Sequence, residues 1–135
     1  MLDGRRRRDV RVTLILEPSV GLVAWVHYAP PLNDSFRKSY RQMLKWNDEL
    51  PFAKFALSED ERPMLTTELA SAAVDTDVLG LTLTRLLAIC DLLLDESARW
   101  LWPGGRVPKD DARERRNQLL FERYGGQLGE LAATE

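Results

Sequence analysis

Residues 36–57 of this chain read FRKSYRQMLKWNDELPFAKFAL, and this stretch decides the fold. Its first part places residues at helical spacing on one apolar face, namely Phe36, Tyr40, Met43 and Leu44. Pro51 cannot continue a helix, so the helix ends before it and residues 52–57 form a strand. The acidic turn SEDERP (58–63) and the strand MLTTEL (64–69) follow. The order predicted here is therefore a helix, a short break and a β-hairpin.

A first β-hairpin is predicted upstream of this helix. Residues 10–16 (VRVTLIL) begin with apolar and polar side chains in alternation, which is the period of a half-buried strand. Residues 17–21 (EPSVG) contain a proline and a glycine, which favour a turn. Residues 22–28 (LVAWVHY) are apolar on both faces, so we expect this strand inside a sheet or against a partner.

A long helix is predicted downstream, at residues 76–101. Its apolar arc is wide enough to cover a sheet on one side and another element or subunit on the other. The segment GGRVPKDD (104–111) is typical of a linker, and residues 112–124 have the pattern of a last, highly charged helix.

These elements together predict an α+β fold in which the helices pack on one face of an antiparallel sheet of about four strands. The predicted organisation is a flexible basic lead-in (1–9), an α+β domain (10–103), a linker (104–111), and a C-terminal helix and tail (112–135).

The residues around the helix-to-strand break resemble the pattern of the YbjN family. In that family a helix ends in a leucine–asparagine pair, and a strand with aromatic residues, an acidic turn and a second strand follow. The corresponding residues here are Leu44, Asn47, Phe52, Phe55, Leu57 and the turn Glu59, Asp60 and Glu61. The resemblance extends over about residues 10–100.

This resemblance implies the fold of type III secretion chaperones and a protein without catalytic activity, often called a sensory-transduction regulator. It also implies a fold suited to dimers and to the binding of extended polypeptide. Family members usually begin with a helix and often a further strand, whereas this chain begins with a basic lead-in. The helix at 112–124 is additional, and it either fills the place of the missing first helix or docks on a neighbouring subunit.

Composition sets further bounds. The chain has 135 residues, which is enough for one domain with a substantial core. Its formal net charge of −2 gives no overall field that favours nucleic acid or acidic lipid. It has one cysteine, and neither a secretory signal nor a transmembrane span is visible, so we expect a cytoplasmic protein without a membrane partner.

The candidate reactive residues favour structural interpretations. His27 is the only histidine, and no nearby residue supplies the partner that triad or metal chemistry requires. Cys90 lies on the apolar stripe of the long helix, where a thiol is inert. Asp91 and Asp95 share one helix face but lack a third ligand, so we interpret them as solvated. We therefore predict no catalytic residue, metal, cofactor or small-molecule substrate.

Two interaction surfaces remain as hypotheses. The favoured one is a protein-binding surface at a sheet edge or on the apolar arc of the long helix, which holds a protein partner or a second copy by strand addition or helix packing. Its predicted partner-binding residues are Trp25, Trp100, Leu101 and Trp102. The tryptophans at the helix end either complete the core or form an association patch. The alternative is nucleic-acid or anionic-surface binding through basic residues, with Arg5, Arg6, Arg7 and Arg8 in one group and Arg37, Arg41 and Lys45 in another.

Overall fold

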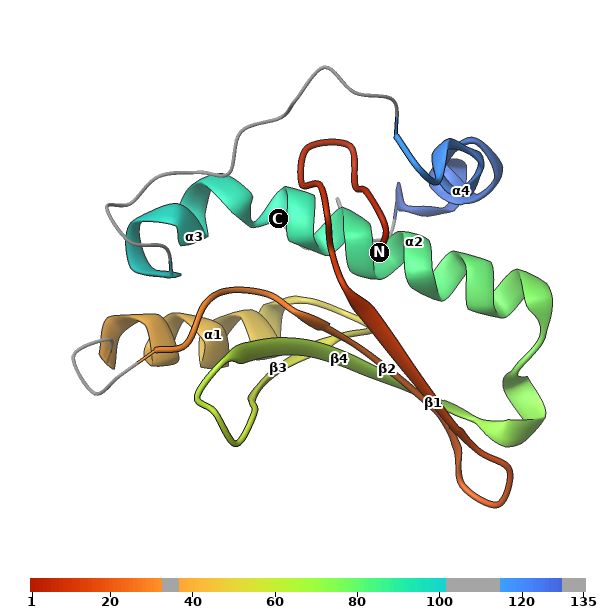
Figure 1. The fold of residues 1–135 in the computed structure, drawn as a ribbon, viewed down its shortest axis with the longest axis horizontal. Coiled ribbons are helices and arrows are strands. Elements are labelled where there is room, and N and C mark those ends of the chain that lie inside the picture. Colours follow the sequence, from red (N-terminus) through yellow and green to blue (C-terminus); the bar gives the residue numbers. More distant parts are fainter. Residues whose placement is uncertain (33–36, 102–114, 130–135) are drawn as a thin grey trace.

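The computed structural model describes residues 1–32, 37–101 and 115–129 of the chain (Figure 1). Four strands form one antiparallel sheet in the order β1-β2-β4-β3. They are β1 (Val12–Glu17), β2 (Gly21–His27), β3 (Lys54–Leu57) and β4 (Pro63–Ala70). The predicted α+β class and the four-stranded antiparallel sheet are confirmed.

The helices differ from the prediction in detail. They are α1 (Arg37–Glu49), α2 (Thr76–Leu92), α3 (Leu94–Leu101) and α4 (Gln118–Tyr124). The predicted single helix at 76–101 is divided in two at Leu93, where the backbone (φ −90°, ψ 0°) departs from regular α-helical values and the N–H is shared between the carbonyls of Ile89 and Asp91. The predicted linker at 104–111 and the start of the last helix lie outside the described residues.

Pro51 ends α1 as predicted, but β3 begins later than residue 52. Phe52 adopts a positive φ of 71°, which a strand does not accommodate. The Arg85 guanidinium lies 3.8 Å from the centre of the Phe52 ring, so this aromatic residue packs against α2 and is not part of the sheet.

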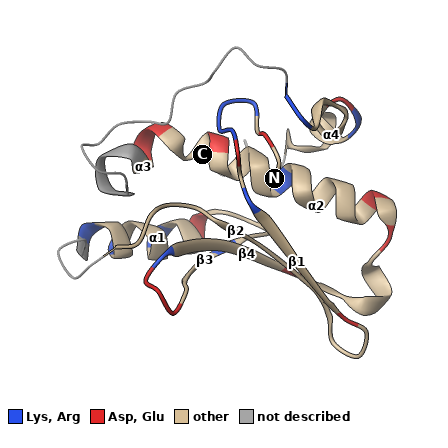
Figure 2. Ribbon diagram, in the orientation of Figure 1, with Lys and Arg blue, Asp and Glu red and all other residues tan. Residues whose placement is uncertain are grey.

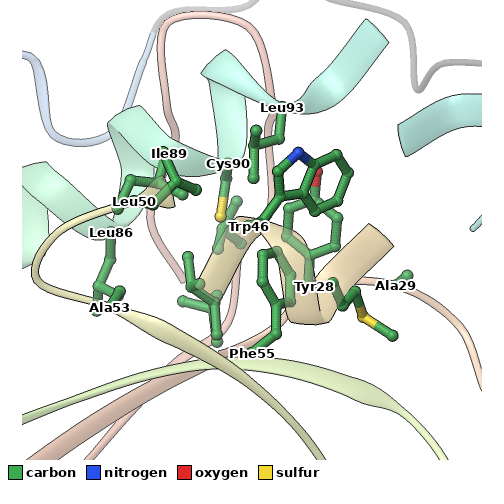
Figure 3. Close-up of a cluster of buried hydrophobic side chains, with 14 of the residues drawn as sticks. Tyr28, Ala29, Trp46, Leu50, Ala53, Phe55, Leu86, Ile89, Cys90 and Leu93 are labelled. Carbon is green, nitrogen blue, oxygen red and sulfur yellow. The ribbon is translucent and has the colours of Figure 1, made fainter. Parts of the chain in front are cut away.

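The core lies between one face of the sheet and the helices. Alternate residues of β2 are buried, and α1, α2 and α3 lie on the side to which these residues point (Figure 1). Figure 3 shows the centre of this core, where Trp46 of α1 lies near Tyr28 and Phe55. The Phe55 ring centroid is 5.1 Å from that of Tyr28, in an edge-on arrangement, and 5.6 Å from that of Trp46. Such contacts add to the free energy gained by burial and fix the position of α1.

Candidate protein-binding surfaces

The sheet has an outer face that no described helix covers (Figure 1). The strand register places Ile15 beside Val23 on this face, and Trp25 between Thr13 and Thr66. Trp25 is only half-buried, in contrast to Ala24 and Val26, which point the other way into the core. The outer face is therefore largely apolar along β1 and β2, with a tryptophan at its centre.

His27 lies at the end of this face. Burial, followed by repulsion from the Arg62 guanidinium, lowers the pKa of His27 below its ordinary value. Its Nδ1 atom is buried without a hydrogen-bond partner among the described residues. Among the residues that the structure describes, no group of three or more His, Cys, Asp or Glu side chains is placed to hold a metal ion.

The two edges of the sheet differ. At the β3 edge, Asn47 of α1 binds the backbone of Phe55 with both ends of its side-chain amide. Its Oδ1 atom accepts the Phe55 N–H at 2.6 Å, and its Nδ2 atom donates to the Phe55 carbonyl at 3.1 Å. Asn47 thus takes the place of a neighbouring strand at this position. The β3 edge is blocked where Asn47 binds it.

The β1 edge has no neighbouring strand among the described residues. Three consecutive apolar side chains on it, Leu14, Ile15 and Leu16, are 44%, 51% and 59% exposed. Leu14 and Leu16 point to the helix side of the sheet, yet the helices do not cover them. This edge is apolar on both faces, and within the described ranges no strand or helix covers it.

A shallow apolar hollow of about 330 Å³ lies between α1 and β3. Leu44 and Leu57 line it, and both side chains are exposed. The YbjN-like sequence pattern around the helix-to-strand break includes these two leucines and Asn47. Asn47 has a structural role, whereas the two leucines face solvent.

The basic residues at the N-terminus belong to a loop, residues 1–10, which lies over α2 (Figure 2). The Asp91 carboxylate accepts three backbone N–H groups from this loop, those of Arg5 at 2.6 Å, Arg6 at 3.0 Å and Arg7 at 2.8 Å. Arg6 also forms two hydrogen bonds of 2.9 Å with Asp95, and these lower the pKa of that carboxyl. Asp91 and Asp95, interpreted from sequence as solvated, therefore both contact the loop, and Asp91 does so through three backbone N–H groups.

The other arginines of the loop also have partners within the chain. Arg8 is 3.9 Å from the fully buried carboxylate of Asp3, and its own side chain is only 6% exposed. The guanidinium of Arg7 lies 5.0 Å from the centre of the Tyr28 ring, inside the core. Local sequence gave no signal for this docking, because the acidic partners on α2 and α3 are more than 80 residues away.

The remaining predicted site residues are more dispersed. Arg41 and Lys45 are exposed on α1, which Figure 2 shows separated from the N-terminal loop by α2 and α3. Arg37 begins α1, but its side chain lies outside the described part, as do those of Trp100 and Leu101 in α3. Trp102 lies wholly outside it. Trp100, Leu101 and Trp102 stay a prediction as a partner surface.

Cys90 is fully buried, and burial raises the pKa of its thiol to about 11. It is visible in Figure 3 among the leucine and isoleucine side chains of α2. Cys90 is thus a core residue.

Residues 5–98 match the YbjN family, which is described as "Putative bacterial sensory transduction regulator". The chain belongs to the YbjN family. The matched region of this YbjN protein begins in the arginine-containing loop and ends within α3, so α4 lies beyond it. Tyr124 of α4 packs on Gly80 of α2, which places this additional helix on its own chain.

Among solved structures, the YbjN chain is similar to a chain of "Crystal Structure of the ExsC-ExsE Complex". The TM-score is 0.49 and the sequence identity 19%, over 63% of this chain and 66% of that chain. The chain thus spans slightly less than two thirds of that neighbour's length. None of the curated proteins is significantly similar. No described helix is long and apolar enough to cross a membrane.

Proposed function

We propose that this YbjN protein is a regulatory module without catalytic activity that binds a protein partner on the outer face of its sheet. The observation that carries the proposal is the uncovered apolar surface centred on Trp25. Ile15 and Val23 lie side by side on it, and Thr13 and Thr66 lie on either side of the tryptophan. A half-buried tryptophan in an open apolar face is typical of the residues that dominate binding energy at protein interfaces.

The rim of this face suits a polypeptide partner. Arg11 and Glu17 stand at the two ends of β1 on the outer side, and Glu68 lies on the same face of β4. An apolar centre with charges of both signs around it is the usual anatomy of a protein interface. A nucleic-acid ligand would instead favour a surface of one sign.

The anion-binding alternative has less support. Arg6 and Arg8 form ion pairs with Asp95 and Asp3, and the guanidinium groups of Arg5 and Arg7 lie over aromatic rings. Each of these contacts would have to be given up, or shared, for the arginine to contact a phosphate. A cytoplasmic location also stays a prediction.

The test replaces Trp25 with threonine, which favours a strand and removes the aromatic surface. The tagged wild-type protein and the Trp25→Thr variant are used to capture partners from an extract of the source cells, with and without nuclease. The matched control is Leu119→Thr, because Leu119 of α4 is an exposed apolar residue away from the sheet.

We expect a protein that survives nuclease, is captured by the wild type and the control, and is lost with Trp25→Thr. Circular dichroism and thermal unfolding establish that the variant is folded. Equal capture of every companion by all three proteins would refute the docking site. Companions lost on nuclease treatment would support the anion-binding alternative.

A further inference from the structure

The β1 edge requires a partner of its own. Natural sheets protect their edges with inward-pointing charges, prolines, bulges or a covering element. Within β1, VTLILE, the only charge is the final Glu17, and the strand contains neither proline nor glycine. An edge of six residues with exposed apolar side chains on both faces is a site for strand addition. The other edge shows the contrast, because Asn47 occupies the backbone of β3.

We propose that a second copy of this chain pairs with this edge, β1 against β1, antiparallel about a two-fold axis at Leu14. Leu14 then faces Leu14 of the second copy, and Val12 faces its Leu16. On the other face Thr13 lies opposite Ile15. At both ends Arg11 lies opposite Glu17, so each dimer contains two opposite-charge pairs.

The backbone and the charges at the two ends of β1 select this register. A two-fold axis perpendicular to the sheet keeps the helix sides of the two copies on the same side, so residues of like face must pair. An axis at Thr13 would set Glu17 against Asp9, which has a positive φ of 57° that a strand does not accommodate and a carboxylate already bound to Arg116. An axis at Ile15 would set Val12 against Pro18, which has no N–H to donate. Only the axis at Leu14 pairs the two charged ends of the strand and buries the exposed leucines against each other.

The resulting dimer has one continuous sheet of eight strands, four from each copy. Its two outer faces become one surface, because the axis is perpendicular to the sheet. Trp25 lies opposite Thr13, and Thr13 lies opposite Ile15 of the second copy. The path from one Trp25 to the other crosses three strand spacings (β2 to β1, β1 to β1 of the second copy, and that β1 to its β2) and is offset by two residues along the strands. The two Trp25 Cα atoms are therefore about 16 Å apart on that surface. The pairing goes beyond the proposed docking of a partner around Trp25, and neither requires the other.

Cysteine cross-linking tests the register. Leu14→Cys places two thiols opposite each other on the axis, where Cα atoms of paired strands are about 4.5–5.5 Å apart, within reach of a disulfide. Thr13→Cys alone and Ile15→Cys alone place their thiols diagonally, at about 7–8 Å, which is beyond that reach. Mixing these two variants should give a cross-linked heterodimer. Cys90 is buried and stays unreacted.

We expect self-cross-linking under mild oxidation for Leu14→Cys alone among the three single variants. Self-cross-linking of Thr13→Cys or Ile15→Cys in preference to Leu14→Cys would overturn the register. A wild-type protein that sediments as a monomer at every concentration tested would overturn the pairing. If Trp25-dependent capture of a partner persists in that monomer, only the pairing fails and the proposed function stands.

A charge-exchange experiment tests the same contact without cysteines. Arg11→Glu and Glu17→Arg each place two like-charge pairs in the dimer, and each should raise the dissociation constant about tenfold at low salt. A mixture of the two variants restores opposite charges at both ends and should form a heterodimer with affinity near that of the wild type. A mixture no tighter than either variant alone would contradict the pairing of Arg11 with Glu17.

Discussion

Replacing Asp91 with alanine should release the N-terminal loop from α2. The Asp91 carboxylate accepts the backbone N–H groups of Arg5, Arg6 and Arg7 at 2.6, 3.0 and 2.8 Å. Three successive N–H groups that converge on one carboxylate form an anion-binding concavity, and here a side chain of the same chain is the anion. Alanine leaves those three donors without their acceptor.

The size of the effect follows from the environment of these bonds. A hydrogen bond to a charged group contributes about 1.5–3 kcal/mol, but the bonds to Arg5 and Arg6 are exposed and water replaces them at little cost. The bond to Arg7 is part-buried, so it contributes more to the free energy that holds the loop in place. Freed loop residues also regain conformational entropy, which offsets part of the loss. We expect a net cost of about 2 kcal/mol, which corresponds to a roughly 30-fold rise in the open population of the loop.

The loop carries its own reporter, because trypsin cleaves after arginine and Arg5 to Arg8 are consecutive. When opening is fast, the rate of cleavage of a folded protein follows the population of the open form. Cleavage within the loop should therefore be about 30-fold faster in Asp91→Ala, while the rest of the domain stays intact. The control is Asp95→Asn, which removes an exposed ion pair with Arg6 and should change the rate little.

Two results would refute this reasoning. One is a cleavage rate for Asp91→Ala within twofold of the wild type, with unchanged denaturant unfolding. The other is an equal acceleration by Asp95→Asn, which would place the holding force in the ion pair and not in the backbone contacts.

Three further predictions follow from the packing. Asn47→Leu removes both hydrogen bonds to the β3 backbone and should lower the free energy of unfolding by about 2 kcal/mol in urea, whereas an unchanged unfolding midpoint would contradict the role of the amide. Gly80→Ala places a Cβ atom about 2.4 Å from the Tyr124 ring and should destabilise the protein. In a Tyr124→Ala background the same substitution should instead stabilise the protein by up to ~1 kcal/mol, because alanine favours a helix more than glycine does. A stability change of the same sign in both backgrounds would contradict the docking of α4 on α2. Burial and the Arg62 charge lower the pKa of His27 in the folded protein, so the unfolded chain binds the proton more tightly. The free energy of unfolding should therefore decrease as pH falls below about 6.5, and His27→Gln should remove this pH dependence. An NMR titration that gives His27 an ordinary or raised pKa would refute the prediction.

The local elements were predictable because their signals are local. Alternation in β1, two-sided apolarity in the interior strand β2, and Pro51 after α1 each act within a few residues. Docking of the N-terminal loop was not predictable, because Asp91 and Asp95 are far from it in sequence and look like solvated helix residues until the fold brings the arginines to them. The break at Leu93 was not predictable either, because the sequence has no proline or glycine there.

The asymmetry between the two sheet edges gives the sequence pattern around α1 a physical meaning. Asn47 satisfies the backbone of Phe55 as a neighbouring strand would, and so closes one edge within the chain. Because a sheet has only two edges, closing the edge at β3 leaves β1 as the place where the sheet can grow. The exposed leucines of β1 point to the helix side, whereas Trp25 points to the outer side. Growth at the edge uses the outward backbone groups and the leucines of β1, whereas docking is centred on Trp25 of β2. Thr13 and Ile15 contribute to both contacts, but Trp25 takes no part in the pairing, so one chain can pair with its own copy and still present Trp25 to a partner.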